Sequence, residues 1–169
     1  MNSGMVPNEL PVRVYRLIKE RFISTPFSAE GARRLGGRWN PPGVGILYTS
    51  ASPELALLEQ IVHLRSLPYS DLPRLVLLTL ILTETPRLID LLDLPPNWQD
   101  EADFGSNHQF LANWLAKPDV LVIGVPSAVV PDSFNYLLHP AHPAFAAVTV
   151  ARTSAFPVDS RLWREQETP

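Results

Sequence analysis

The chain has 169 residues, 46% of them hydrophobic, and its 14 basic and 17 acidic side chains leave a formal charge of −3. This length suits one domain of about 100–200 residues with a sizeable core. The lack of cysteine excludes disulfides, Cys-ligated metal sites and a thiol nucleophile, and the mild acidity argues against a nucleic-acid partner. No segment resembles a signal peptide or reaches the ~20 apolar residues of a membrane span. We therefore expect a cytoplasmic globular protein.

The predicted elements of the first half are short. Residues 12–17 alternate between two faces and predict a strand. Residues 22–45 contain so many prolines and glycines that we expect a loop region with one short helix. A second strand is predicted over residues 46–49. The tripeptide SPE at 52–54 then predicts a helix over about 53–67, because Ser is a favoured N-cap, Pro suits the first helical position and an acid suits the first turn.

The second half continues the same pattern of short elements. The continuous apolar run 75–82 lies between two prolines and predicts a strand buried on both faces. Strands are also expected over 87–92, 120–125 and 145–150, and a helix over 107–116 from its apolar spacing. Because the strands do not alternate regularly with long helices, we predict an α+β fold.

No repeat or linker divides the chain. We therefore expect residues 1–169 to form a single domain with a core over about 11–162. The ends, 1–10 and 163–169, are expected to be loose.

Glu59 is the most informative single residue. It follows Leu55 by four positions and precedes Val62 by three, so its carboxylate lies on an apolar stripe of the predicted helix. An ionised acid there needs a partner or a wet cleft. Two interpretations stay open, namely a helix-edge acid that reaches solvent or an arginine, and a carboxylate in a cleft.

Three further positions carry groups suited to a ligand. In the string GGRWNP at 36–41, the glycines permit a tight turn or a close backbone approach, and Arg38 offers a planar fork of donors for phosphate. Tyr48 ends the second predicted strand. Ser127 follows the strand over 120–125 between two prolines, at a sheet edge where ligands often bind. Their structural alternatives are a surface turn, a half-buried strand tyrosine and a turn serine.

Histidines suggest a competing metal site. Glu59 and His63 are one helical turn apart, and His139 and His142 lie close together in the sequence. Imidazole nitrogens and a carboxylate can ligate zinc. However, the chain has no His-Glu-x-x-His pattern.

Several strings occur in an order that resembles the RES-domain family of bacterial toxins: GGRWNPPG, ILYTS, PELALLE, VPSAVVP, NYLLHPAHP and DSRL, together covering nearly the whole chain. His139 departs from the resemblance, which leads us to expect Asn there. The resemblance implies an ADP-ribosyltransferase-like fold with mixed or antiparallel sheets and flanking helices. It also implies an enzyme that consumes NAD as its substrate, by hydrolysis or by phosphorolysis with inorganic phosphate, or one that passes ADP-ribose to a protein.

The same resemblance implies roles for four residues. Glu59 is the catalytic residue, and Arg38, Tyr48 and Ser127 bind the substrate. The nicotinamide ring of NAD carries a positive charge, so nicotinamide departs as a neutral molecule. No second acid is therefore needed to protonate it. Glu59 would stabilise the developing positive charge, while Arg38 would clamp a phosphate, Tyr48 would stack on nicotinamide and Ser127 would orient its ribose.

No metal or bound cofactor is expected, and the implied partner is an Xre-like antitoxin that forms a hetero-oligomer with the chain. Two alternatives from other classes stay open. They are a zinc-dependent hydrolase and a non-catalytic interaction domain.

Overall fold

The computed structural model describes residues 11–163, so the loose ends expected at 1–10 and 163–169 lie outside the described residues, except for Trp163. Within that range the chain forms one seven-stranded mixed sheet, in the order β4-β5-β6-β2-β1-β3-β7. The strands are β1 (Val12–Lys19), β2 (Leu47–Ser50), β3 (Leu75–Leu82), β4 (Arg87–Leu88), β5 (Val122–Pro126), β6 (Phe134–Leu138) and β7 (Thr149–Phe156). The α-helices are α1 (Glu30–Leu35), α2 (Pro53–Leu64), α3 (Gly105–Phe110) and α4 (Ala112–Ala116). The predicted α+β class is confirmed.

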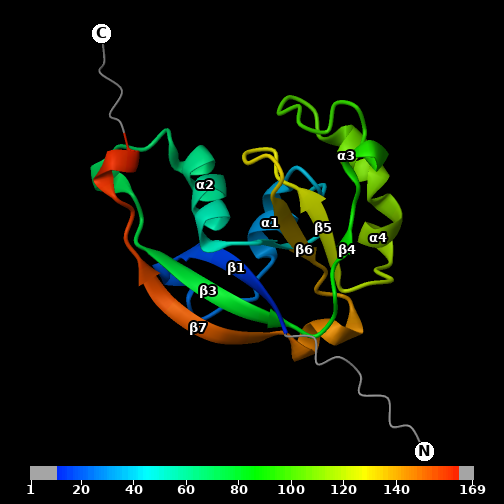
Figure 1. The fold of residues 1–169 in the computed structure, drawn as a ribbon, viewed down its shortest axis with the longest axis horizontal. Coiled ribbons are helices and arrows are strands. Elements are labelled where there is room, and N and C mark those ends of the chain that lie inside the picture. Colours follow the sequence, from blue (N-terminus) through cyan, green and yellow to red (C-terminus); the bar gives the residue numbers. More distant parts are fainter. Residues whose placement is uncertain (1–10, 164–169) are drawn as a thin grey trace, which may run out of the picture.

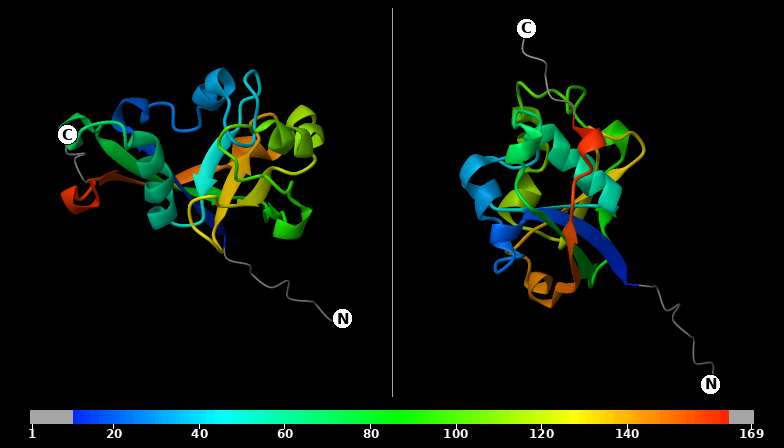
Figure 2. Two further views of the ribbon diagram at one scale, coloured as in Figure 1. Left: turned by 90° about the horizontal axis from the view of Figure 1, so that it is seen from above. Right: turned by 90° about the vertical axis from the view of Figure 1, so that its left-hand side faces the viewer.

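The sheet bends sharply between β1 and β2. These two strands share the single register pair Tyr15↔Ser50, whereas β1 and β3 pair along their whole length from Val12↔Leu82 to Lys19↔Leu75. Figure 1 shows the result, with β1, β3 and β7 running across one side of the molecule and β5 and β6 standing at a steep angle to them. Helix α2 packs against both β1 and β2, beside the bend, as the views in Figure 2 also show.

The core consists of apolar side chains on both sides of this bend. Helix α2 buries Leu55, Ala56 and Leu64, and Ala56 and Leu64 pack with Leu17 of β1 and Leu77 of β3. Each such fully buried leucine stabilises the fold by roughly 1.5–3 kcal/mol. On the other side, three tryptophans pack with the β5 and β6 side chains in a second cluster, which also contains residues of α4.

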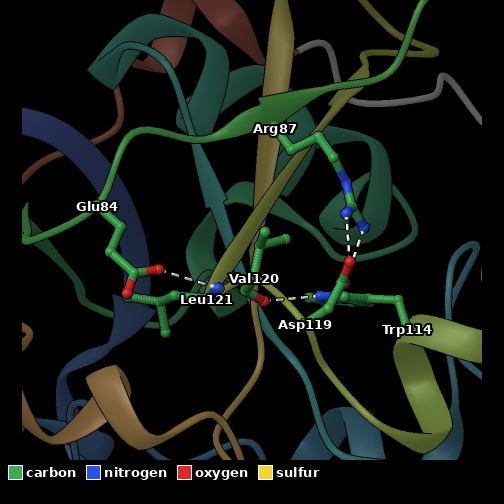
Figure 3. A network of polar contacts seen from close by, with 6 residues as sticks. All are labelled: Glu84, Arg87, Trp114, Asp119, Val120 and Leu121. Carbon is green, nitrogen blue, oxygen red and sulfur yellow. Dashed lines mark hydrogen bonds and ion pairs between the residues drawn. The ribbon is translucent and has the colours of Figure 1, made fainter.

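The connection from β3 to β4 is tied to the segment that leads into β5 (Figure 3). The Leu121 N–H donates to the Glu84 carboxylate at 3.3 Å, and Arg87 forms an ion pair with Asp119 at 2.7 Å. The indole N–H of Trp114 donates to a backbone carbonyl in the same segment. These contacts fix α4 relative to the start of β5.

Most predicted elements are confirmed, with shifted ends. The strands expected over 12–17, 46–49, 75–82 and 120–125 form with small shifts in their bounds, and residues 22–45 hold the one short helix α1. Helix α2 ends at Leu64, three residues before the predicted end.

Three expectations about local structure were wrong. The strand predicted over 87–92 contains only two strand residues before a 3-10 turn, and the helix predicted over 107–116 is divided at Leu111 into α3 and α4. The strand predicted over 145–150 begins at Thr149, because Pro143–Ala147 form a 3-10 turn capped by His142. Strand β6 was not predicted.

In the part of the chain that the structure describes, no helix is long and apolar enough to cross a membrane.

Candidate active site

A pocket of about 230 Å³ opens at the bend of the sheet. Its walls come from β1, β2, β6, α2 and residues 28–32, which include the start of α1. The polar and aromatic side chains of its lining include Tyr15, Arg16, Tyr48, Glu59, His63 and Asn135. The pocket therefore lies where strands from both halves of the sheet meet one helix.

Helix α2 places Glu59 in this pocket. The Ser52 side chain accepts a hydrogen bond from the Leu55 N–H, which caps the first turn, and Pro53 occupies the first helical position. The buried Leu55 and Ala56 turn the apolar stripe of the helix toward the sheet, so Glu59 one turn later faces the same way. Of the two interpretations of Glu59, the structure supports a carboxylate in a cleft.

The Glu59 carboxylate is held through one oxygen. Its Oε1 accepts a hydrogen bond from the Ser127 hydroxyl at 2.8 Å and another from the Asn135 amide at 2.5 Å. Among the described residues, no hydrogen bond reaches Oε2. Hydrogen bonds to a charged acceptor are the stronger kind, so the side chain is oriented while one oxygen stays available to a ligand.

The hydrogen-bonding capacity of Ser127 is filled by these contacts. Its hydroxyl donates to Glu59 and accepts from the N–H groups of Val129 and Val130, each at 3.0 Å. Because a hydroxyl has one donor and two acceptor sites, these three contacts use all of them. Ser127 is also only 5% exposed. The loop that follows it closes through the Ser127 N–H and the Ser133 carbonyl.

Arg16 is a cation in the same pocket. Its Nη2 donates to the Ser28 carbonyl at 3.0 Å, and its buried Nε has no hydrogen-bond partner within residues 11–163. The ion pairs of the described chain do not include it. Burial lowers the pKa of Arg16 to about 10, which still leaves it charged at neutral pH. A half-buried cation without an acid partner carries a desolvation cost, and an anionic ligand would offset that cost.

Tyr48 joins the pocket to the GGRWN turn. Its hydroxyl donates to the Asn40 carboxamide oxygen at 2.8 Å and accepts from the Trp39 N–H at 3.1 Å. Burial raises the pKa of the Tyr48 hydroxyl, which keeps it protonated. A Cβ at Gly37 would lie 2.7 Å from that hydroxyl oxygen, and Gly36 has a φ of 70°, so the two glycines permit the close approach and the turn.

Arg38 lies outside the lining of the pocket within the described chain. Its guanidinium donates to the Trp98 carbonyl at 2.8 Å and lies 5.0 Å from the centre of the Phe104 ring. Of the four residues predicted for the site, Glu59 and Tyr48 line the pocket, and Ser127 donates to Glu59 without lining it. Arg38 instead contacts a neighbouring loop.

The structure does not bring the histidines of the zinc alternative together. His63 lies at the pocket with Glu59, whereas His139 packs edge-on against Trp114 and lies 3.1 Å from the Leu115 carbonyl. The Nδ1 of His142 accepts the Ala144 N–H. Residues 11–163 contain no group of three or more His, Asp or Glu side chains arranged to hold a metal ion.

The placement of His139 predicts a pH dependence of stability. Burial lowers the pKa of His139 in the folded chain, while the unfolded chain takes up this proton below about pH 6.5. The unfolded state therefore binds more protons, and the free energy of unfolding falls as the pH drops below that value. We expect His139→Asn to show a smaller loss of Tm between pH 7.5 and pH 5 than the original protein. Equal losses would contradict this role for His139.

Comparison with known proteins identifies the family. The family model of the RES domain matches residues 13–159. The chain belongs to the RES domain family. It is 30% identical over 151 residues to a protein named Toxin Res from Yersinia enterocolitica, covering 88% of this chain and 98% of that one. It is 33% identical over 152 residues to the Prs ADP-ribosylating toxin of a Sphingobium species, covering 85% and 91% of the two chains.

A solved structure has the same fold. The crystal structure of the MbcT–MbcA toxin–antitoxin complex of M. tuberculosis aligns with a TM-score of 0.60 at 18% identity, covering 87% of this chain and 85% of that one. The family resemblance drawn from the sequence motifs is therefore confirmed: this chain has a RES domain in sequence, relatives named as toxins, and the fold of that solved structure.

The sequence analysis missed two residues of the pocket. Arg16 shares a face of the first predicted strand with Val12 and Val14, which is the same signal, a charge on an apolar stripe, that singled out Glu59. Asn135 lies in the strand that was not predicted, so no local pattern pointed to it.

Proposed function

We propose that this RES-domain protein is a toxin enzyme that cleaves the nicotinamide–ribose bond of NAD. The observation that carries the proposal is the pocket at the bend of the sheet. Its lining includes Glu59, whose Oε2 receives no hydrogen bond from the described residues, and the half-buried Arg16, which has no ion pair within residues 11–163. A fixed carboxylate stabilises the positive charge that develops on the ribose as neutral nicotinamide departs. The relative named as an ADP-ribosylating toxin supports chemistry at this bond.

Arg16 supplies the site for the anionic part of the substrate. A guanidinium binds phosphate oxygens in a planar, two-pronged geometry. Arg16 lines the pocket, and its buried Nε has no hydrogen-bond partner within residues 11–163. We assign it to the pyrophosphate of NAD. Tyr48 offers an aromatic wall for the nicotinamide ring, and Ser127 acts by holding Glu59, because its hydroxyl is saturated.

Arg38 is proposed to bind a substrate phosphate at the edge of the site, as the family resemblance implies. Its guanidinium now donates to the Trp98 carbonyl and would exchange this contact for phosphate. Because lysine keeps the charge and loses the two-pronged geometry, we expect Arg38→Lys to weaken NAD binding several-fold in calorimetry. Unchanged affinity would leave Arg38 as a support for the 97–104 loop.

The nucleophile that completes the reaction is water or inorganic phosphate. Water gives ADP-ribose, nicotinamide and a proton, and phosphate gives ADP-ribose 1″-phosphate and nicotinamide. A second candidate function is protein ADP-ribosylation, which the name of the Sphingobium relative favours. The two functions share the bond that breaks and differ in the group that attacks the sugar.

Mass analysis of the products distinguishes these outcomes. The purified chain is incubated with NAD, with and without phosphate, with and without a chelator, and in parallel with labelled NAD and a cell extract. We expect nicotinamide release that survives chelation, since no metal is proposed. A labelled protein without free ADP-ribose would select the second function, and the absence of nicotinamide release in every arm would overturn the proposal.

We also propose that an Xre-like antitoxin covers the pocket and forms a hetero-oligomer with this chain. An enzyme that consumes NAD would damage its own cytoplasm, and the similar MbcT fold was solved as a toxin–antitoxin complex. An acidic group of the antitoxin would suit Arg16. We expect the complex to bind NAD far more weakly than the free toxin, and equal affinities would show that the pocket stays open.

A further inference from the structure

Asn135 connects Glu59 to the sheet. It lies in β6, where it is the register partner of Ser50 on β2 and of Val125 on β5. Its amide nitrogen donates to Glu59 Oε1 at 2.5 Å, and its carboxamide oxygen accepts the Ser50 hydroxyl at 2.8 Å. The backbone of Asn135 is thus paired on both sides, and its side chain bridges a strand and a helix.

Chemistry determines the direction of this amide. An ionised carboxylate only accepts hydrogen bonds, so the NH₂ group of Asn135 must face Glu59 and its oxygen must face Ser50. The Ser50 hydroxyl is 5% exposed and donates to that oxygen. If the amide were reversed, its oxygen would face the Glu59 carboxylate oxygen inside the pocket wall. Two acceptors facing each other away from water are costly.

Asn135 and Ser127 reach the same carboxylate oxygen from different positions. Ser127 follows β5, and Asn135 lies within β6. A single donor would leave the carboxylate free to turn about that bond, whereas two donors on Oε1 define its plane and the direction of Oε2. Glutamate has three rotatable side-chain bonds, and fixing such a side chain costs conformational entropy that the two hydrogen bonds offset.

We propose that Asn135, supported by Ser50, is a positioning residue that aims Glu59 Oε2 at the anomeric carbon of the bound nicotinamide ribose. This role rests on the proposed NAD cleavage. Asn135 acts through Glu59 and moves no proton itself. An electrostatic group stabilises a transition state only if it is already oriented when charge develops, so loss of the amide lowers kcat more than it changes KM.

The first test is Asn135→Ala. We expect kcat to fall roughly 10- to 100-fold with KM within about threefold, because the interaction lost is one made mainly in the transition state. The matched control is Asn107→Ala, which removes a buried amide that donates to the Trp98 carbonyl and has no bond to Glu59. The control is expected to lower Tm and to keep kcat within about twofold of the original protein.

The second test is Asn135→Asp, which keeps the shape and replaces the donor by an acceptor. At neutral pH two carboxylates then meet, and such a pair retains one proton as the pH falls. A protonated carboxyl at this position donates to Glu59 as the amide does. We therefore expect activity that is low at pH 8 and partly recovered at pH 5.5, relative to the original protein at each pH. A purely structural role would not produce this recovery.

The third test is a double-mutant cycle with Glu59→Gln. If Asn135 acts through Glu59, Asn135→Ala lowers kcat by less than about threefold in the Glu59→Gln background, since effects of residues that act as a unit are not additive.

The outcomes separate this proposal from the proposed function. No nicotinamide release by the original protein would overturn both. Normal activity of the original protein together with unchanged kcat in Asn135→Ala, or full additivity in the cycle, would overturn the role of Asn135 alone.

Discussion

Glu59→Gln is expected to bind NAD and to turn it over roughly 10²–10³ times more slowly than the original protein, which is the scale for losing one preorganised electrostatic group. Glutamine keeps the length and shape of the side chain and can still accept from Ser127 and Asn135 through its oxygen. It lacks the charge that stabilises the oxocarbenium-like transition state. Steady-state kinetics by nicotinamide release, with calorimetry for NAD affinity, measures the two effects separately.

The matched control is Glu54→Gln. It makes the same substitution five residues earlier on α2, where Glu54 is exposed in the first helical turn. This variant should keep full activity. A folded Glu59→Gln protein that consumes NAD at the normal rate would remove Glu59 from the catalytic role.

Arg16→Met is expected to weaken NAD binding by about 10- to 150-fold, which corresponds to one charged hydrogen bond of about 1.5–3 kcal/mol. The same substitution is expected to leave Tm unchanged or raise it, because methionine removes a half-buried cation that has no acid partner within the described chain and fills much of its volume. Titration calorimetry measures the expected loss of NAD affinity, and thermal unfolding measures the expected unchanged or higher Tm.

Arg13→Met is the control on the same strand. Arg13 is exposed, three residues before Arg16, and does not line the pocket. Its loss should change neither NAD affinity nor activity. Unchanged NAD affinity in Arg16→Met would show that the pyrophosphate binds elsewhere, and a large fall in Tm would show that Arg16 stabilises the fold.

A gain of stability with a loss of binding would mark Arg16 as a functional residue. Active sites hold charged groups in places where packing alone would not favour them. Arg16 and Glu59 share this property, because each is a charged residue on an otherwise apolar stripe.

The sequence by itself determined the elements that capping residues and continuous apolar runs specify locally. Ser52 and Pro53 specified the start of α2, and the apolar run 75–82 specified β3. The motif order identified the family, and through it led to the prediction that Glu59 is the catalytic residue. Strand β6 was not predicted, because its five residues include Asn135 and Tyr136 among the apolar ones. The pattern of this short central strand resembles that of a polar loop.

Only the tertiary structure decided which side chains meet. Ser127 and Asn135 lie 68 and 76 residues from Glu59 along the chain, and their common contact depends on β5, β6 and β2 being neighbours in the sheet. Strand order is set by the packing of the whole domain, whereas periodicity and capping report only on residues a few positions apart. The charges on Arg16 and Glu59 could be noticed in the sequence. That they share one pocket, with one carboxylate oxygen held and the other free, follows from the fold.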